Sequence, residues 1–366
     1  MAFDPFSLAQ PGICDLQAYQ PGKPVDELER ELGITNIIKL ASNENPLGPG
    51  PKAVSAMQAA LPESSRYPDG NGFRLKQVLA RRYNVDQNRI TLGNGSNDVL
   101  ELLARVFAGP GLDVVFSRHA FAVYPIAAMA VGANPVVVPA RHWGYDLDAL
   151  LASITDTTRL VFIANPNNPT GTWLNETELS AFLDAVPDHV VVVLDEAYAE
   201  YVDEPGYPDS IAWLADYPNL VVTRTFSKAY GLAALRVGYA LSSVEVADLL
   251  NRVRQPFNVN ALALAAAEAA LADNAYLEQS VAINKAGMQQ LVEGFRKLGL
   301  DYIESVGNFV CVDVAREAAP VFKALLQQGV IVRPVANYEM PNHLRVTVGT
   351  QEENQRFLAA LETVLS

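Results

Sequence analysis

At residues 223–232 the chain reads Thr-Arg-Thr-Phe-Ser-Lys-Ala-Tyr-Gly-Leu, directly after the apolar run Leu220-Val221-Val222. Such a run is typical of a buried strand, so Lys228 is expected at the C-terminal end of that strand. In open α/β sheets this edge binds ligands. A lysine that is partly desolvated there has a lowered pKa and can act as an amine nucleophile. Most lysines are instead solvated surface residues, so the interpretation depends on the residues that accompany Lys228.

Strand-like and helix-like segments alternate through the middle of the chain. This alternation is typical of a mostly parallel sheet with helices on its faces. We therefore predict an α/β fold with a sheet of about seven strands. The expected strands are residues 89–92, 113–117, 135–139, 159–164, 190–194, 220–226 and 237–241, and the expected helices are 97–107, 121–131, 147–154 and 176–186.

The two ends of the chain predict a second, smaller α+β domain. The first forty or so residues are rich in proline and glycine and indicate an extended arm before a short strand at 37–40. We predict an arm with part of the small domain at 1–45, a large domain at 46–243 and a small C-terminal domain at 244–366. Its expected helices are 244–254, a long helical region ending near 298, 320–328 and 358–365, with strands at 302–314, 330–335 and 343–347.

The composition restricts the possible partners. Lys and Arg number 27 and Asp and Glu 41, which gives a net charge of −14 and argues against nucleic acid or an anionic membrane as partner. An anionic substrate would need a few well-placed arginines. The two cysteines and four histidines show no metal-ligand spacing. Residues 1–6 show no signal-peptide pattern and no apolar run is long enough to span a membrane, so a cytoplasmic protein is expected.

Polar residues follow three other predicted strands. The turn Gly-Asn-Gly-Ser-Asn at 93–97 precedes a helix and can hold a phosphate on its N–H groups, although it also suits an ordinary tight turn. The loop Asn-Pro-Asn-Asn-Pro-Thr-Gly at 165–171 offers amide donors in residue types that are usual for turns. Asp195 ends an apolar strand and needs a cationic partner or strong donors, unless it only caps a turn. Tyr198 follows it closely.

Three arginines are candidates for binding anions. Arg236 comes shortly after Lys228, and its planar donor fork suits a phosphate, with a surface salt bridge as the alternative. Arg333 and Arg345 lie in strand-like apolar segments near the end of the chain. A buried guanidinium must be paired, so each binds either an internal acid or an anionic group of a substrate.

Taken in order, these motifs resemble the fold-type I pyridoxal-phosphate aminotransferases, and the resemblance covers nearly the whole chain. It rests on the turn at 93–97, the loop at 165–171, Leu-Asp-Glu-Ala-Tyr at 194–198, Ser227-Lys228 and Arg236. Within this superfamily the chain is most similar to the histidinol-phosphate aminotransferases. The more particular signals are Tyr19 ahead of Pro-Gly-Lys-Pro at 21–24, Asn-Glu-Asn-Pro at 43–46, Arg-Tyr-Pro-Asp-Gly at 66–70 and Leu-Arg-Val-Thr-Val-Gly-Thr at 344–350.

The resemblance implies pyridoxal 5'-phosphate as the cofactor, covalently bound to Lys228. Asp195 would hold the pyridine nitrogen protonated, which makes the ring an electron sink. Tyr198 and Asn168 would bind the phenolic oxygen, and Phe121 would stack on the ring. The large domain would therefore hold the cofactor.

The resemblance also implies how the anions are bound. The cofactor phosphate would contact hydroxyl, amide and guanidinium groups from Ser96, Asn97, Thr225, Ser227 and Arg236, and from Tyr67 of the partner subunit in a homodimer. Arg345 would bind the carboxylate of glutamate or 2-oxoglutarate in one half-reaction and the phosphate of histidinol phosphate in the other. Arg333 and Tyr19 would assist with that phosphate, and Asn43 would lie beside the substrate.

Three residues depart from the family pattern, and the first two, Phe121 and Ala18, concern substrate shape and cofactor tuning. Phe121 replaces a common tyrosine, Ala18 a proline before Tyr19, and Ala234 a common glycine; none removes a group that the chemistry needs. An aromatic amino-acid aminotransferase and a threonine-phosphate decarboxylase share most of these features and stay open as alternatives. A cofactor-binding regulator would carry a basic DNA-binding domain, and this acidic chain offers no sign of one.

Overall fold

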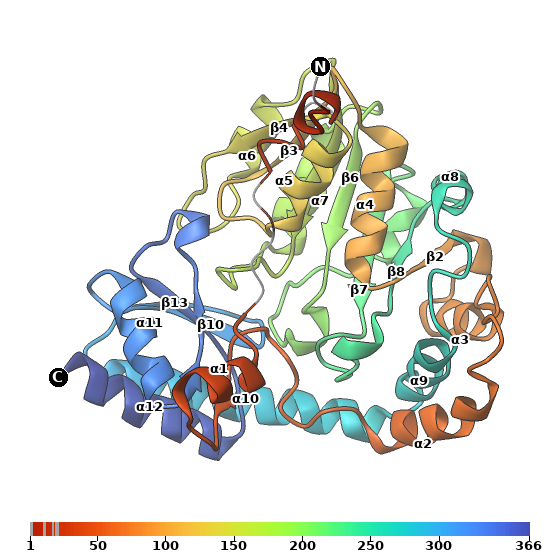
Figure 1. Ribbon diagram of the computed structural model, residues 1–366. Helices are drawn as coiled ribbons and strands as arrows, with labels where there is room; N and C mark the ends of the chain where they lie inside the picture. The colour runs from red at the N-terminus through yellow and green to blue at the C-terminus, as the bar shows by residue number, and fades with distance from the viewer. Residues whose placement is uncertain (1–2, 10–11, 17, 19–21) are drawn as a thin grey trace.

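The computed structural model describes residues 3–9, 12–16, 18 and 22–366. Its larger sheet has seven strands in the order β2-β8-β7-β6-β5-β3-β4 (Figure 1). Every strand begins and ends within one residue of its predicted bounds, and the predicted α/β sheet is confirmed. The strands are β2 (Ile90–Gly93), β3 (Asp113–Ser117), β4 (Asn134–Val138), β5 (Thr158–Ala164), β6 (Val191–Asp195), β7 (Leu220–Thr225) and β8 (Gly238–Leu241).

The sheet is mixed, because β8 runs antiparallel to both of its neighbours, β2 and β7, while the other pairs are parallel. The segment between β7 and β8 contains only a single short 3-10 turn. A parallel return would need a longer crossover, usually through an α-helix. The chain therefore turns back directly, and residues 226–237 stay at the edge of the sheet where β7 ends.

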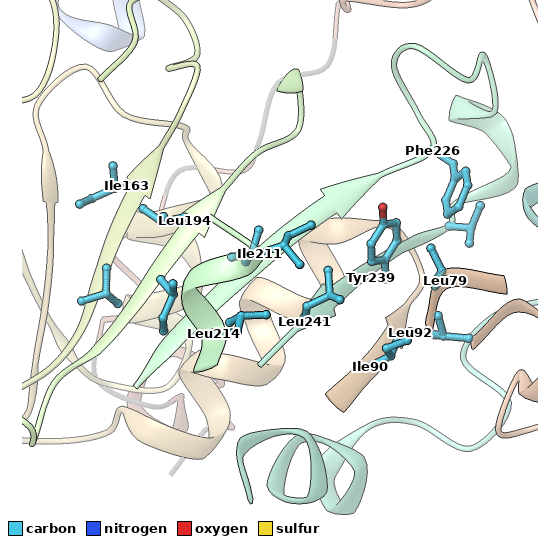
Figure 2. Packing of buried hydrophobic residues seen from close by; sticks show 14 of the residues in the cluster. Leu79, Ile90, Leu92, Ile163, Leu194, Ile211, Leu214, Phe226, Tyr239 and Leu241 are labelled. Carbon is cyan, nitrogen blue, oxygen red and sulfur yellow. The ribbon is translucent and has the colours of Figure 1, made fainter. Parts of the chain in front are cut away.

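The central strands are mostly apolar because helices cover both faces of the sheet. All five residues of β6 are buried, and the first four alternate between two hydrophobic clusters. Val192 and Leu194 point into the first cluster, and Val191 and Val193 into the second. Figure 2 shows Leu194 in the first cluster beside Ile163 of the neighbouring strand β5.

Each cluster is closed by its own set of helices (Figure 1). The first contains residues of α2 (Pro51–Ala60), α3 (Phe73–Tyr83), α6 (Leu147–Ala152), α7 (Glu176–Ala185) and α9 (Ala261–Leu271). The second contains residues of α4 (Ser96–Phe107), α5 (Val123–Ala130) and α8 (Val244–Val253). Although α8 and α9 follow residue 243, they pack around the large sheet, and the domain division at 45 and 243 stays a prediction.

A smaller sheet forms from the end of the chain. It is antiparallel, in the order β12-β13-β10-β9, and a short parallel pair, β1-β11, forms a two-stranded sheet of its own. Its residues form a separate cluster with the helices α10, α11 and α12. The bounds are β1 (Ile38–Lys39), β9 (Tyr302–Ile303), β10 (Phe309–Asp313), β11 (Val330–Ile331), β12 (Arg333–Pro334), β13 (His343–Thr347), α10 (Asn274–Lys297), α11 (Ala318–Gln327) and α12 (Gln351–Leu365).

Several predicted segments of this part differ from the structure. The expected strand 302–314 is a hairpin of β9 and β10, because Ser305 and Gly307 form a turn within it. The expected strand 330–335 divides between two sheets as β11 and β12. The last helix begins at Gln351 and not near 358, since Thr350 and Glu353 form a capping box there.

The proline-rich N-terminal arm, which was predicted to be extended, contains a helix. This helix, α1, spans Val25–Leu32, and it starts directly after Pro24. Lys23 pairs with Glu27 and Glu31 on its surface, and Leu28 is buried. None of the helices in the described part of the chain combines the length and the apolar character needed to cross a bilayer.

Candidate active site

One cavity collects thirteen of the fifteen predicted site residues. It lies at the carboxyl ends of β5, β6 and β7, and the smaller sheet closes its other side through β12 and β13. The predicted residues that line it are Asn43, Ser96, Asn97, Phe121, Asn168, Asp195, Tyr198, Thr225, Ser227, Lys228, Arg236, Arg333 and Arg345. Residues that are distant in sequence therefore meet because parallel strands end at one edge.

Lys228 follows β7 and reaches into the cavity. Its Nζ donates to the carbonyl oxygen of Ser42 at 3.1 Å and lies 5.7 Å from the centre of the Tyr198 ring. Burial lowers the pKa of Lys228 from 10.5 to about 7, and the positive charge of Arg345 adds to this effect. At neutral pH a large share of these amines is therefore uncharged and able to act as a nucleophile or a base.

Asp195, the last residue of β6, is buried and accepts a hydrogen bond on each carboxylate oxygen. Tyr124 Oη donates to Oδ2 at 3.0 Å, and Thr223 Oγ1 donates to Oδ1 at 3.1 Å. Burial raises the pKa of Asp195 from 3.8 to about 6, while the two hydroxyl groups oppose that rise. The backbone N–H of Ala197 also favours the ionised form, and the carboxylate keeps acceptor capacity for one more donor in the cavity.

Tyr198 connects the two sides of the cavity. Its hydroxyl accepts a hydrogen bond from Nδ2 of Asn43 at 2.9 Å, and the backbone N–H of Asn43 donates to Thr347 Oγ1 on β13 at 2.9 Å. Burial raises the pKa of Tyr198 to about 12, so the hydroxyl stays protonated and can donate. It is oriented toward the cavity by the edge-on packing of its ring against Phe309.

Donors gather where α4 begins. Ser96 is the first residue of that helix, and Gly95 before it has a φ of 84°, which favours glycine. Arg236 Nη1 donates to Ser227 Oγ at 3.4 Å and to the Ala233 carbonyl at 3.0 Å. A Cβ on Gly95 would lie 2.4 Å from Arg236 Nη2, so a larger residue here would displace the guanidinium from this position. The helix end, the hydroxyls and the guanidinium together suit a phosphate.

Arg345 of β13 is a buried cation with no carboxylate within 4 Å among the described residues. Nη1 donates to Asn168 Oδ1 at 2.6 Å and Nη2 to the Ala41 carbonyl at 2.9 Å, while the buried Nε has no acceptor in the described structure. Arg333 of β12 is the residue directly opposite Arg345 in the register of β12 and β13. Neutral acceptors leave the charge of Arg345 uncompensated, which favours binding an anion.

Two predicted residues lie outside this cavity. Tyr67 is 82% exposed and stacks on Phe257 with 4.6 Å between ring centres, so in this single chain it does not reach the cavity. Tyr19 lies outside the described residues.

Other residues of the site were not predicted. Tyr338 lines the cavity from the small sheet side. Tyr124 and Thr223 donate hydrogen bonds to the Asp195 carboxylate and do not line the cavity themselves. Thr223 could have been found from the sequence, because it precedes Thr225 by two residues on the same strand and shares its face. Tyr124 and Tyr338 carry no comparable sequence signal, since Tyr124 lies on α5 and Tyr338 on the short 3-10 turn Ala336–Tyr338.

Comparison with known proteins assigns the family. The model of the family described as "Aminotransferase class I and II" matches residues 35–361. The chain belongs to the aminotransferase class I and II family. The predicted resemblance to fold-type I aminotransferases is thereby confirmed.

Close relatives share one name. The chain is 65% identical over 362 residues to "Histidinol-phosphate aminotransferase 2" of Pseudomonas fluorescens, covering 98% of each chain. It is 63% identical to the protein of the same name from Pseudomonas aeruginosa, covering 99% of each. Among solved structures, the histidinol-phosphate aminotransferase of Sinorhizobium meliloti in complex with pyridoxal-5'-phosphate matches with a TM-score of 0.91 and 32% identity, covering 100% of this chain and 98% of that one.

Proposed function

We propose that this chain is a pyridoxal-phosphate-dependent histidinol-phosphate aminotransferase of histidine biosynthesis, which exchanges an amino group between histidinol phosphate and the glutamate/2-oxoglutarate pair. One observation carries the proposal: a half-buried lysine, a buried aspartate and an uncompensated arginine meet in one cavity. The full-length identity to relatives of that name supports the choice of substrate.

The residues of the cavity fit the cofactor group by group. Lys228 offers the amine for the aldehyde carbon, and Asp195 is a carboxylate for the ring nitrogen. Tyr198 is a donor for the phenolic oxygen, and Asn168 in the same cavity carries an amide. The donors beside Gly95 match a phosphate in charge and in number. When bound, pyridoxal phosphate supplies an electron sink that stabilises negative charge at the substrate carbon.

Lys228 performs the proton transfer in this proposal. A base that removes a proton from carbon and returns one elsewhere works best with a pKa near the working pH, and burial lowers the pKa of Lys228 to about 7. Its amine takes the proton from the carbon that bears the substrate amino group. The hydrogen bond to the Ser42 carbonyl holds the free amine inside the cavity.

Arg345 selects anionic substrates. Its guanidinium is held by Asn168 and the Ala41 carbonyl, so its position is set before the substrate arrives. The phosphate of histidinol phosphate and a carboxylate of glutamate are both anions that suit a planar donor fork. The two substrates use this site in turn, as in a ping-pong reaction, with Arg333 and Tyr19 assisting the phosphate.

A homodimer completes the site. Tyr67 stands exposed beside Phe257 and away from its own cavity, as expected of a side chain that reaches the cofactor phosphate of a partner. Exposed aromatic pairs are common at subunit interfaces. We place this dimer in the cytoplasm, free of nucleic acid and membrane.

A substrate panel and the Arg345→Ala variant test this function. The purified enzyme should turn over histidinol phosphate in preference to phenylalanine or threonine phosphate, without release of CO₂. Arg345→Ala should raise KM for both glutamate and histidinol phosphate by at least about tenfold, because both lose the same charged hydrogen bonds. A preference for phenylalanine would contradict the substrate, and CO₂ release would contradict the reaction. A loss for only one substrate would contradict the shared anion site.

A further inference from the structure

The carboxylate of Asp195 is held from behind by two hydroxyl groups on different elements. Tyr124 comes from α5 and bonds Oδ2, and Thr223 comes from β7 and bonds Oδ1. Both are fully buried, and neither lines the cavity. Each oxygen thus accepts from one side-chain hydroxyl on the side away from the cavity, and the carboxylate keeps acceptor capacity for a ligand in the cavity.

The positions of these hydroxyls are set by packing. The Tyr124 ring stacks on Phe162 at 4.7 Å and 8°, and the cavity residue Phe121 packs edge-on against it at 5.9 Å and 89°. Thr223 lies directly opposite Asp195 in the β6-β7 register. Both side chains are therefore ordered without any ligand, which suits groups that must hold another residue in place.

Asp195 needs such support because its surroundings disfavour its charge. It is buried, Glu196 adds a second negative charge beside it, and no cationic side chain lies within 4 Å of it among the described residues. Besides Tyr124 and Thr223, the backbone N–H of Ala197 favours the ionised form. Hydrogen bonds to a carboxylate are among the strongest in proteins, so the two hydroxyls carry much of this support.

We propose that Tyr124 and Thr223 are positioning residues that keep the Asp195 carboxylate ionised and aimed at the cofactor ring nitrogen, and that Tyr124 also supports Phe121. This inference rests on the proposed function for the identity of the cofactor. It assigns no contact with the substrate to either residue. Their effect should therefore appear in cofactor binding, and in turnover only as a consequence of it.

The test compares full-length variants that remove one hydroxyl each. Tyr124→Phe and Thr223→Val should each weaken pyridoxal phosphate binding by about tenfold, measured by absorbance titration of the cofactor-depleted protein. Without one donor the pKa of Asp195 rises further above about 6, so the pH below which binding weakens should move upward. Thr223→Ser keeps a hydroxyl and should restore the affinity and the pH profile.

Tyr239→Phe is the matched control. Tyr239 is a buried tyrosine of the same sheet whose hydroxyl bonds Tyr83 at 2.7 Å, and it does not touch Asp195. It should lose stability much as Tyr124→Phe does but keep the affinity and the pH profile. If Tyr124→Phe fails to fold, the Thr223→Val and Thr223→Ser pair decides.

Unchanged cofactor affinity and pH profile in both hydroxyl-free variants would overturn the inference, as would equal losses in Tyr239→Phe. Failure of the proposed function is a separate result. A wild-type protein that binds pyridoxal phosphate but does not turn over histidinol phosphate would contradict the substrate, and the binding comparison would still decide the roles of Tyr124 and Thr223.

Discussion

At the scale of single residues, burial favours the uncharged forms of both Lys228 and Asp195 and shifts their pKa values in opposite directions. It lowers the pKa of Lys228 to about 7 and raises the pKa of Asp195 to about 6, because in each case the charged form loses its hydration. Their mutual attraction is a smaller effect, since no ion pair joins them within 4 Å. Both groups therefore change protonation close to physiological pH.

The lowered pKa of Lys228 predicts how cofactor capture depends on pH. Only the neutral amine attacks an aldehyde, so the rate of pyridoxal phosphate incorporation should rise as pH increases through about 7 and level off above it. Stopped-flow absorbance between pH 5.5 and 9 measures this rate. Borohydride reduction followed by peptide mapping should find the label on Lys228.

Lys76→Met serves as the control for that profile. Burial also lowers the pKa of Lys76, to about 8, but this lysine lies away from the cavity. The variant should keep the wild-type profile, whereas Lys228→Ala should incorporate no cofactor and lose at least about a thousandfold in turnover. A label on another lysine, or a rate that does not change with pH, would contradict the assignment.

At the scale of elements, the anion site depends on the close approach of a helix end and a turn. The N-terminus of α4 meets Arg236, which itself has a φ of 54°. Gly95 lies between them and leaves room for the guanidinium only because it has no Cβ. The site is thus built by backbone geometry as much as by side chains.

Gly95→Ala should displace Arg236 and weaken phosphate binding. The affinity for pyridoxal phosphate should fall by about tenfold or more, while the affinity for pyridoxal, which has no phosphate, should stay near the wild-type value. Gly206→Ala is a matched control, because Gly206 has a φ of 87° and no neighbour within 4 Å of an added Cβ. Equal losses for both ligands, or in both variants, would indicate general strain and contradict this role.

At the scale of the whole molecule, the site forms where the two sheets meet. The larger sheet carries Lys228 and Asp195, and β13 of the smaller sheet carries Arg345 and Thr347. Asn43 joins the two parts through Tyr198 and Thr347. Destabilising the smaller sheet should therefore affect substrate binding directly, since that sheet positions Arg345.

The proposed dimer predicts complementation between two defective variants. Tyr67→Ala should bind the cofactor weakly, and Lys228→Ala should be inactive. If Tyr67 serves the partner's site, a mixed dimer holds one site with both residues intact. Random reassociation should then give about a quarter of wild-type activity at limiting cofactor. Unfolding and refolding the two variants together, followed by assay, measures it; activity no higher than the average of the separately refolded variants would contradict the shared site.

Local sequence was sufficient to locate the strands of the large sheet and most of the cavity. Apolar runs that end in turn residues mark where a buried strand stops, so each strand was predicted to within one residue. Parallel strands end at one edge, which is why Lys228, Asp195 and Asn168 could be expected together. The resemblance to aminotransferases added the roles of these residues.

Tertiary structure alone decided the features that depend on packing between distant segments. Three such features are the antiparallel direction of β8, the helix α1 and the division of 330–335 between two sheets. The nearby proline and glycine residues point to an extended arm and not to α1, and a short apolar run shows neither the direction of a strand nor the sheet that it joins. The same holds for Tyr124, a helical residue whose hydroxyl meets Asp195 only after α5 packs on the sheet. Sequence periodicity reports which face a residue occupies, whereas its partner across the core is set by how whole elements pack.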